Sequence, residues 1–343
     1  MANISNKQTL KNELNNDGEL IMTNKLEIKD KRILKELDLN ARQSNSQIAK
    51  KAKLSKNIVN YRINRLEQIG LINGYNTIFD YSRLGYFMVR VFMDFYELDI
   101  EKEEDLIQYL VNEKSTGRIT KTVGNWDLLV SFYVKDVNEF SIIWKKFIVK
   151  HRGIIKEYNT NFVTKGIFFR RAYLLGEKKD ISDVSWKRGS STVEDIDEVD
   201  LKIIHMLTKN ARTPIEKMAT ATGLGSMAVI YRIKQLIKKK IITGYRVDIN
   251  FDKLGYSYYK INLELEDTSI TKSLIEFCHQ HPNIISIVES ISDNVDFEFN
   301  MEAKNFDVFL EIIEELKKQF PRKIRNYKYV RLLKNYKNMY MPL

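Results

Sequence analysis

An internal repeat constrains this chain of 343 residues more than any other feature of its sequence. When the sequence is shifted along itself by 170 positions, Asn40-Ala41-Arg42 aligns with Asn210-Ala211-Arg212. About a third of positions 40–86 match at this one offset without a gap, which is hard to reach by chance. A period of this length indicates duplicated domains rather than a solenoid of short repeats. We therefore expect both halves of the chain to fold in the same way.

The first part of each copy has the pattern of a three-helix unit. In the first copy, Ser44 and Gln47 have the spacing of a capping box at the start of the second helix. Ser55 is a suitable N-cap for the third helix. Residues 71–79 are expected to form two short strands around a turn. Three helices followed by such a two-stranded wing predict a winged helix-turn-helix.

The rest of each copy alternates strands and helices in the βαββαβ order of the ferredoxin-like split βαβ. In the first copy, strands are expected near 86–97, 117–124, 127–134 and 154–164, with helices near 102–113 and 137–150. In the second copy, strands are expected near 257–265, 284–291, 295–301 and 323–333, with helices near 270–280 and 304–319. The predicted fold class is α+β, with two winged helix-turn-helix domains alternating with two ferredoxin-like domains.

These patterns divide the chain into six segments. Residues 1–24 are predicted to be a disordered N-terminal arm, and the polar, Ser-rich residues 176–195 a linker between the copies. The predicted domains are winged helix-turn-helix units at 25–82 and 196–252, and αβ effector or assembly domains at 83–175 and 253–343.

Positive charge is concentrated in two short segments of the chain, whose formal net charge is +11. Residues 25–75 hold twelve Lys and Arg against five acidic residues, and residues 195–245 hold nine against five. Two basic segments on a balanced scaffold predict two modules that face a polyanion, although solvated lysine-rich helices are the alternative. The absence of a long apolar run and the single cysteine, Cys278, predict a cytoplasmic protein with no membrane partner.

The predicted third helix of the first copy carries the residue types that read DNA. Val59, Ile63 and Leu66 form its apolar stripe. The opposite face holds amides that can pair with adenine and a tyrosine that reaches phosphates or bases, so the predicted base-reading residues are Asn57, Asn60, Tyr61 and Asn64. Basic and hydroxyl side chains at the margins predict phosphate contacts by Lys53, Ser55, Lys56, Arg62 and Arg65.

The second copy keeps the apolar stripe but changes the opposite face, where Met227 and Ile230 cannot hydrogen-bond a base edge. The predicted phosphate contacts here are Tyr231, Arg232, Lys234, Lys238 and Lys239. We therefore expect the first module to recognise the DNA sequence and the second to contribute mainly electrostatic attraction to the phosphates. The alternative is that the second module no longer binds DNA and only packs or dimerises.

The stretch from ILKELDLNARQSNSQIAKK to INGYNTIFDYSRLGY resembles the helix-turn-helix of the Lrp/AsnC (feast/famine) regulators. The resemblance continues through the split βαβ, and it covers the chain twice, at about 26–174 and 196–334. It implies a transcriptional regulator that binds double-stranded DNA and responds to a small, amino-acid-like effector. Family members pair their αβ domains face to face, so the resemblance implies an intramolecular pseudo-dimer that can assemble into a homo-oligomer.

In the family, effectors bind where αβ domains meet, at the turn between the second and third strands. The matching segment is Gly124-Asn125-Trp126-Asp127, which makes these four residues the candidate effector site. Glycine permits the tight turn, the carboxylate can bind free amides or an ammonium group, and Trp126 can form a pocket wall. A structural hairpin turn is the alternative. In the second copy the glycine and the aromatic residue are missing.

Other chemistries find less support in the sequence. Cys278, His279 and His281 lie at one expected helix end with no matching ligands elsewhere, so we expect no metal site and no cofactor. An AsnC-like fold also occurs in sirohaem decarboxylases, but no convergent cluster of His, Arg and Tyr is visible, and we expect no enzyme activity. An architectural DNA binder of low specificity remains the other alternative.

Overall fold

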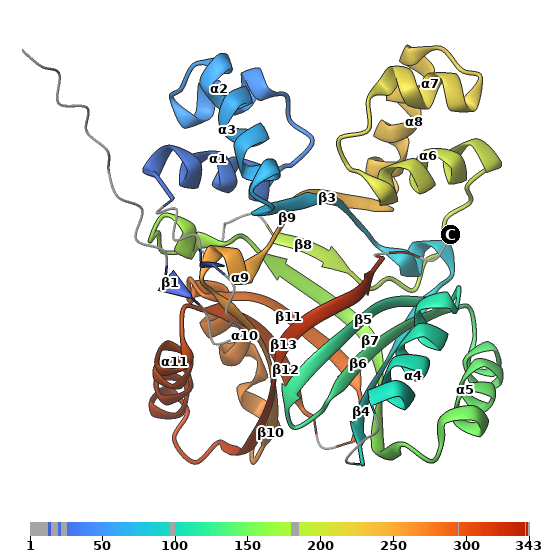
Figure 1. The fold of residues 1–343 in the computed structure, drawn as a ribbon, viewed down its shortest axis with the longest axis vertical. Helices are drawn as coiled ribbons and strands as arrows, with labels where there is room; N and C mark the ends of the chain where they lie inside the picture. The colour runs from blue at the N-terminus through green and yellow to red at the C-terminus, as the bar shows by residue number, and fades with distance from the viewer. Residues whose placement is uncertain are drawn as a thin grey trace, which may run out of the picture.

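A computed structural model describes residues 26–96, 100–179, 185–293, 295–339 and 341. It also describes the backbone of the short paired strands β1 (Glu13–Leu14) and β2 (Leu20–Ile21). The remainder of the predicted N-terminal arm lies outside the described residues. Two helical units, which we call head 1 and head 2, lie above one large β-structure (Figure 1).

Each head is the three-helix unit that the sequence predicts. Head 1 contains α1 (Ile28–Leu39), α2 (Asn45–Ala52) and α3 (Lys56–Gln68). Head 2 contains α6 (Glu198–Lys209), α7 (Ile215–Thr222) and α8 (Ser226–Lys238). The capping box of Ser44 with Gln47 is present, and the Ser55 side chain caps α3. These short-range hydrogen bonds satisfy amides that have no partner inside the helix, which is why the helices start where the sequence predicts.

The segment predicted to form a wing behaves differently. Residues 72–79 form one continuous strand, β3 (Ile72–Phe79), which pairs with β9 (Ile242–Ile249) of the other copy in an antiparallel two-stranded sheet. The expectation of two short strands around a turn within the copy is therefore wrong. Without a second strand in its own copy, β3 would have backbone N–H and C=O groups with no partner. The equivalent strand of the second copy, β9, supplies hydrogen bonds along one edge of β3.

The residues that define the repeat lie at this contact between the heads. The backbone N–H of Ala41 donates to Tyr245 O (3.0 Å), and the backbone N–H of Ala211 donates to Tyr75 O (2.8 Å). Arg42 donates to the carbonyl oxygen of Ala211, and Arg212 makes the reciprocal bond to the carbonyl oxygen of Ala41. Buried apolar side chains of both heads form one continuous cluster. The two heads are therefore one packed unit related by pseudo-twofold symmetry.

Eight of the described strands close into a barrel beneath the heads (Figure 1). The first copy supplies β4 (Phe87–Phe95), β5 (Thr116–Gly124), β6 (Leu128–Val134) and β7 (Ile155–Phe169). The second copy supplies β10 (Ser257–Leu265), β11 (Ile284–Ile291), β12 (Phe297–Ala303) and β13 (Ile324–Asn338). The two four-stranded sheets are joined along both edges, by β13 with β5 and by β11 with β7. The predicted α+β class is confirmed, and the halves pair within one chain.

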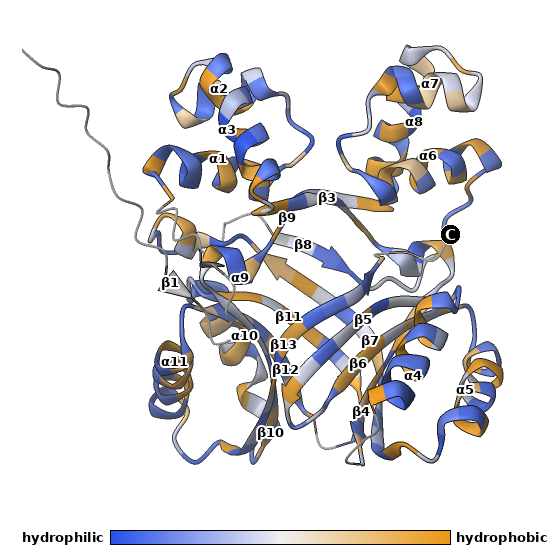
Figure 2. Cartoon of the chain, in the orientation of Figure 1, coloured by the Kyte–Doolittle hydropathy of each residue, from blue (hydrophilic) through white to orange (hydrophobic). Residues whose placement is uncertain are grey.

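Helices cover the outside of this barrel, and Figure 2 shows that strands and helices alike carry hydrophobic residues, which pack together between the two layers. These are α4 (Ile100–Asn112), α5 (Val137–His151), α10 (Thr271–Gln280) and α11 (Phe306–Gln319). Each half has its own core between sheet and helices. Short turns of helix occur at η1 (Tyr81–Leu84), η2 (Ala172–Leu174), α9 (Phe251–Leu254) and η3 (Thr268–Ile270).

The predicted linker is structured where it is described. Residues 185–188 form β8 (Ser185–Arg188), which extends the sheet beyond β7. Trp186 on this strand is 4% exposed and packs on Gly244 of β9, where an added Cβ would lie 2.0 Å from the indole ring. The segment is polar overall, but its one tryptophan is buried and anchors it to β9. The expectation of a linker without regular structure is therefore wrong for residues 185–188.

Candidate nucleic-acid interface and interior cavity

The outer face of α3 presents three of the four predicted base-reading residues to solvent. Asn57, Tyr61 and Asn64 are exposed, with Tyr61 at 68%. Asn60 is only half-buried, and its Oδ1 accepts a hydrogen bond from Asn45 Nδ2 (2.6 Å). The helix turns polar side chains outward because its apolar stripe is buried in the core of the head. Three adjacent polar side chains on one exposed helix face can contact base edges in a major groove.

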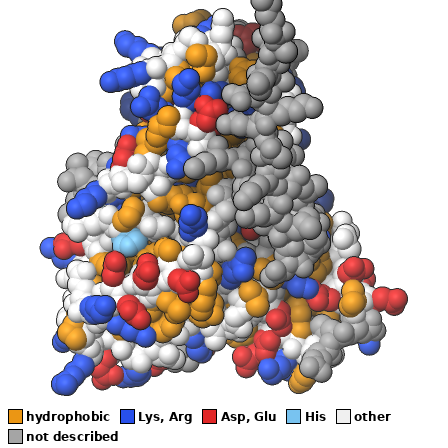
Figure 3. All heavy atoms as spheres, turned by 60° about the vertical axis from the view of Figure 1, so that its left-hand side comes forward, with side chains coloured by type: hydrophobic (Ala, Val, Ile, Leu, Met, Phe, Trp, Pro, Cys, Tyr) orange, Lys and Arg blue, Asp and Glu red, His pale blue; other side chains and the backbone are white. Residues whose placement is uncertain are grey.

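Four exposed lysines surround the start of this helix. Lys50 and Lys51 lie in the last turn of α2, Lys53 follows it, and Lys56 begins α3. Lys51 has one carboxylate neighbour, Glu36, at 3.6 Å. Figure 3 shows Lys and Arg side chains projecting from the upper part of this face, whereas the lower part mixes both signs of charge. The cluster places positive charge beside the exposed amides, where a phosphate backbone would run.

The other predicted phosphate contacts of head 1 hold the head together instead. Arg62 donates to Asp30 (2.9 Å) and to Glu27 (2.7 Å), and its side chain is only 12% exposed. Arg65 lies 3.5 Å from the same fully buried Asp30 carboxylate. Ser55 Oγ accepts the backbone hydrogen bond that caps α3. Arg62 and Arg65 are thus engaged within the head, whereas the Ser55 hydroxyl accepts its bond and can still donate to a phosphate. The predicted phosphate contacts stay predictions.

Head 2 presents a more apolar surface at the corresponding helix. Met227 and Tyr231 on α8 are 76% and 62% exposed. Lys234 and Lys238 are exposed, but the Lys239 ammonium donates to the carbonyl oxygen of Asp195. Arg232 repeats the role of Arg62, because it pairs with two carboxylates of the head at 2.8 and 2.9 Å. Of the predicted phosphate contacts in head 2, Lys239 and Arg232 are thus already engaged.

The lysine cluster of head 1 has no counterpart in head 2. At the 170-residue offset the four lysines correspond to Thr220, Ala221, Gly223 and Ser226. On α8 the exposed lysines are Lys234 and Lys238, which lie toward its C-terminal end. The exposed lysines of α6 and α7 are Lys202, Lys209 and Lys217. The positive charge of α8 therefore lies away from its N-terminal end, which is the part of a recognition helix that usually contacts base edges.

The turn at residues 124–127, the candidate effector site, forms part of the contact between the two halves of the barrel. Gly124 has φ +123°, and an added Cβ would lie 2.6 Å from the carbonyl oxygen of Tyr329 on β13. The backbone N–H of Asn125 donates to that same oxygen (3.1 Å), and Asn125 Oδ1 accepts from the Tyr329 N–H (2.9 Å). The amide that was expected to bind a ligand pairs with the other half of the barrel.

The remaining residues of this turn also have structural partners. Trp126 is half-buried against the small cluster inside the barrel. Asp127 Oδ2 accepts from the backbone N–H of Phe95 (2.9 Å). The second copy repeats this bond between Asp296 and the N–H of Leu265 (2.7 Å), although it lacks the glycine and the tryptophan. Because both copies make this hydrogen bond, the aspartate has a structural role in the turn that needs no bound effector.

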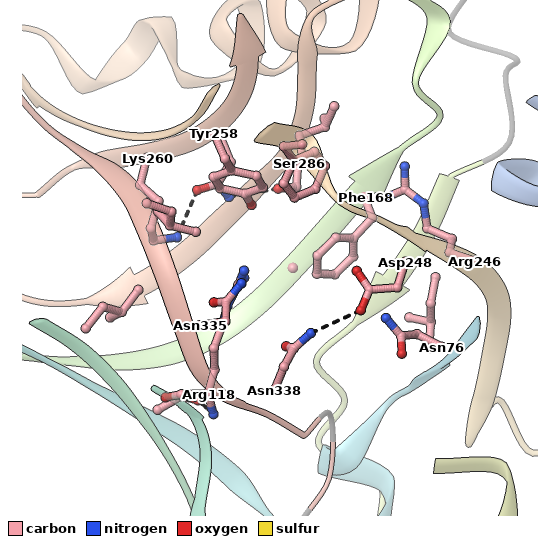
Figure 4. A pocket seen from close by; sticks show the side chains of 18 of the residues that line it. Asn76, Arg118, Phe168, Arg246, Asp248, Tyr258, Lys260, Ser286, Asn335 and Asn338 are labelled. Carbon is pink, nitrogen blue, oxygen red and sulfur yellow. Dashed lines mark hydrogen bonds between the residues drawn. The ribbon is translucent and has the colours of Figure 1, made fainter. Parts of the chain in front are cut away.

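A cavity of about 510 Å³ lies inside the barrel, at the end that faces the heads (Figure 4). Every barrel strand contributes to its wall, and β3, β8 and β9 close it from above. Its polar lining includes Arg118, Lys260, Ser286 and Asp248, and its aromatic lining includes Tyr258. The cavity therefore belongs to both halves and to the strands that carry the heads.

Two cations that line this cavity share one buried carboxylate. Arg90 on β4 makes a bidentate ion pair with Glu298 on β12 across the barrel, at 2.5 and 2.6 Å. Lys260 Nζ donates to Glu298 and to Asn300, both at 2.8 Å. Burial opposes ionisation of Glu298, but Arg90 and Lys260 together hold its pKa down to about 2. Burial and nearby Arg90 lower the pKa of Lys260 to about 8, against the pull of Glu298.

A second buried network joins head 1 to the barrel. Asp38, at the end of α1, accepts from the backbone N–H and Nη1 of Arg171 (2.7 and 2.6 Å) and from Nε of Arg246 (2.9 Å). Arg171 also pairs with Glu302 on β12 (2.9 Å), which accepts a bond from the Tyr173 hydroxyl. Burial opposes ionisation of Asp38, but Arg246 and Arg171 hold its pKa below the usual value.

Comparison with known proteins matches both heads to DNA-binding families. Residues 26–73 match the winged helix-turn-helix DNA-binding family, and residues 196–237 match the AsnC-type helix-turn-helix domain. The HTH-type transcriptional regulator LrpA of Pyrococcus horikoshii is 47% identical over 66 residues, which are 19% of this chain and 47% of that protein. The chain thus spans about half the length of this relative.

A second relative extends the match beyond the head. The proline dehydrogenase transcriptional activator of Rhodobacter capsulatus is 30% identical over 114 residues, which are 33% of this chain and 73% of that protein. The chain belongs to the Lrp/AsnC family. Both of its helical heads match DNA-binding domains, and these relatives are named as transcriptional regulators.

The tandem Lrp/AsnC arrangement also has a counterpart among solved structures. The siroheme decarboxylase NirDL superimposes with a TM-score of 0.59 over 92% of this chain and 94% of that chain. The sequence identity is 11%, so the similarity concerns the fold of the two proteins.

Sequence reasoning missed the cavity of this Lrp/AsnC chain. Arg90, Arg118, Tyr133 and Tyr258 all line it, so arginine and tyrosine do converge here, although the described lining includes no histidine to complete the His, Arg and Tyr cluster that was considered. These residues come from different strands, and no local spacing connects them. One signal was present in the sequence, because charged residues such as Glu298 occupy strand positions whose alternation points them inward.

The side chains of the Cys-His segment considered in the sequence analysis have different surroundings. Cys278 is fully buried in the core of the second half, and burial raises its pKa. His281 lies 3.6 Å from Glu315, and burial lowers its pKa to about 4. Within the described ranges, no three His, Cys, Asp or Glu side chains are grouped so as to hold a metal ion. Likewise, none of the helices described is long and apolar enough to cross a membrane.

Proposed function

We propose that this chain is a sequence-specific, DNA-binding transcriptional regulator in which head 1 supplies most of the affinity and specificity. The observation that carries this proposal is the exposed polar face of α3, with Asn57, Tyr61 and Asn64, beside the cluster of exposed lysines. Such a surface offers base contacts and phosphate contacts on one helix.

The proposal revises the expected division of labour between the heads. Head 2 exposes Met227 at the start of its recognition helix and has no lysine at the positions of the head 1 cluster. Two of its cationic side chains, Arg232 and Lys239, are engaged within the protein. Head 2 therefore contributes apolar contacts, such as those with thymine methyl groups, and a smaller electrostatic grip.

Two different heads in one chain also determine the kind of site. Homodimeric regulators read palindromic sites because the symmetry of the protein matches that of the operator. Here β3, β9 and the shared core fix the spacing of two heads with different surfaces. We propose a non-palindromic operator. The pseudo-dimer replaces an ordinary dimer, and further homo-oligomerisation remains a prediction that light scattering of the purified chain would check.

Matched double variants test the dominance of head 1. Each lost phosphate contact lowers the slope of log K against log salt by about 0.9. Lys53→Gln with Lys56→Gln should therefore lower the slope by about 2. Lys234→Gln with Lys238→Gln in head 2 should change it less. Binding is measured by fluorescence anisotropy of a labelled operator duplex. Equal effects of the two double variants, or a larger effect in head 2, would refute the assignment.

Base specificity is tested separately with a specific and a random duplex. Asn64→Ala should weaken specific binding by about 1–3 kcal/mol and leave random-duplex binding nearly unchanged. Met227→Ala is the matched change on the recognition helix of head 2 and should have a smaller effect. An architectural binder would instead show no difference between the duplexes for the unmodified protein, and that result would overturn the proposal of specificity.

The proposal includes the absence of catalysis. The likeness to a siroheme decarboxylase is one of fold, and it does not by itself favour an enzyme. Purified protein mixed with sirohaem should release no carbon dioxide beyond the protein-free rate. Catalytic release that depends on the protein would make the chain an enzyme and overturn this part of the proposal.

A further inference from the structure

The cavity inside the barrel has the size and enclosure of a ligand site. Its volume of about 510 Å³ lies within the range of roughly 300–1,000 Å³ that small-molecule sites occupy. It combines charged side chains with aromatic rings, among them Phe168 and Tyr258 (Figure 4). It is separate from the turn at residues 124–127.

The two halves contribute different residues to this cavity. Strand register places Glu298 of the second half where the first half has Leu129. It also places Ser286 of the second half where the first half has Arg118. A symmetric dimer would present each of these residues twice. In the fused chain the two halves differ at these positions, so the cavity is asymmetric and can hold one ligand in a single orientation.

The charges that line the cavity leave an excess of positive charge. Arg90 and Lys260 share the single carboxylate of Glu298. Arg118 has no carboxylate within 4 Å among the residues that the structure describes. Its Nε donates to Asn335 Oδ1 (3.3 Å), and its guanidinium lies over the Tyr258 ring. Arg118 is half-buried, and a cation that lines an enclosed cavity with no carboxylate beside it favours an anionic partner.

The carboxylate on the opposite wall does not neutralise this excess. Burial raises the pKa of Asp248, against the attraction of Arg118. Its side chain accepts from Asn338 Nδ2 at 3.5 Å. Burial therefore disfavours the charged form of Asp248, which makes Asp248 a weak counter-charge for Arg118.

Buried polar atoms without partners point into the same interior. Asn161, which is fully buried, has neither its amide nitrogen nor its oxygen hydrogen-bonded, and it lies two residues from the cavity-lining Val163 on the same face of β7. Arg90 Nε is also buried without a partner, and so is Oδ1 of Asn262, which shares the inward face of β10 with Lys260. Buried polar groups normally have hydrogen-bond partners, so these atoms mark capacity for a polar ligand.

We propose that this cavity binds a small aromatic carboxylate, whose anionic group lies between Arg118 and Lys260 and whose ring packs against Tyr258 and Phe168. Ligand occupancy then alters DNA binding, because β3 and β9 line the same cavity and carry the heads. The regulatory half of this proposal rests on the proposed DNA-binding function. The ligand-binding half does not.

The binding half is tested by calorimetry on the full chain. The probes are benzoate, phthalate and 1-naphthoate, with 1-naphthamide as the neutral control. At least one carboxylate should bind with one site per chain, and the amide should bind at least ten-fold more weakly than 1-naphthoate. No binding of any carboxylate at millimolar concentration, or equal binding of the amide, would overturn the proposal.

Variants locate the site. Arg118→Gln should weaken carboxylate binding at least ten-fold, and Arg118→Lys should restore most of it. Asn335→Ala, on the exposed rim, should weaken binding several-fold by releasing Arg118, and it keeps the test decisive if Arg118→Gln fails to fold. Arg325→Gln, an exposed arginine on the same strand as Asn335, is the matched control and should bind normally. Unchanged binding in both cavity variants would place the ligand elsewhere.

The regulatory half is tested by the DNA affinity measured with and without saturating 1-naphthoate. The unmodified protein should change its affinity at least three-fold, and Arg118→Gln should not respond. An unchanged affinity in the unmodified protein would refute the regulatory half alone. Failure of the ligand-free protein to bind DNA would refute the proposed function and leave the calorimetric result standing.

Discussion

Replacing Asp38 by asparagine should destabilise the junction between head 1 and the barrel more than most single substitutions. The Asp38 side chain is almost fully buried, and it accepts hydrogen bonds from two arginines that are themselves buried. One of these arginines, Arg171, ends the first half of the barrel, and the other, Arg246, lies on β9 of the second copy. One carboxylate of head 1 therefore neutralises charge from two other parts of the chain.

The size of the effect follows from what the substitution leaves behind. Asparagine keeps the shape of the side chain but removes its charge and points an NH₂ group at a guanidinium. Removing one partner of a buried ion pair costs about 3–5 kcal/mol, because the remaining charge stays buried without compensation. Glu302 still pairs with Arg171, so the expected loss lies near the lower end, about 3 kcal/mol.

Urea unfolding, followed by circular dichroism and tryptophan fluorescence, measures this loss. Asp105→Asn is the matched control, because Asp105 forms an exposed pair with Lys150 whose side chains are 60% and 50% exposed. Such surface pairs contribute about 0–1 kcal/mol. If Asp38→Asn cost no more than Asp105→Asn, the buried network would not stabilise the junction, and our account of how head 1 is attached would be refuted.

Three further predictions follow from the same structure. Gly244→Ala should lower the free energy of unfolding by about 1–3 kcal/mol, because the new Cβ would overlap the Trp186 ring. Gly74→Ala, at the equivalent position of the first copy, should be tolerated because nothing lies within 4 Å of its Cβ. Thermal melting compares the two variants. Glu298→Gln should flatten the acid limb of stability between about pH 4 and pH 2, since the lowered pKa of Glu298 adds stability that the native protein loses as pH falls through that window. Arg62→Leu should raise amide hydrogen exchange in head 1, because it strips a buried carboxylate of its main partner; unchanged exchange would show that the ion pair is dispensable.

Several features of the fold were predictable because they depend on neighbouring residues. The capping box of Ser44 and the N-cap of Ser55 require only a few successive positions, and the structure contains both. Strand alternation and helical periodicity located the barrel strands to within a few residues, since the inward and outward faces differ in polarity along each strand. The 170-residue repeat predicted that the second copy would follow the first.

The candidate site was predictable only in part. The sequence identified Asn57, Tyr61 and Asn64 as polar positions on a helix face, and all three are exposed. It could not show that Arg62 faces a buried carboxylate 32 residues earlier in the chain, because basic side chains on a helix margin have the same pattern whether they bind phosphate or a neighbouring helix. Whether these residues bind DNA stays a prediction.

The sequence by itself determined the two copies, the order of their elements and the three-helix heads. Helical periodicity and caps depend on residues a few positions apart, and the repeat is visible when the sequence is compared with itself. Only the tertiary structure decided that residues 72–79 pair with the other copy, that Trp186 anchors the segment between copies, and that a charged cavity forms where eight strands meet. These outcomes depend on which sheet edges join and which side chains face each other across the barrel. The contact between Arg90 and Glu298 could not be predicted from the sequence. The alternation of polar and apolar residues identifies each strand, but it does not show which strand lies opposite.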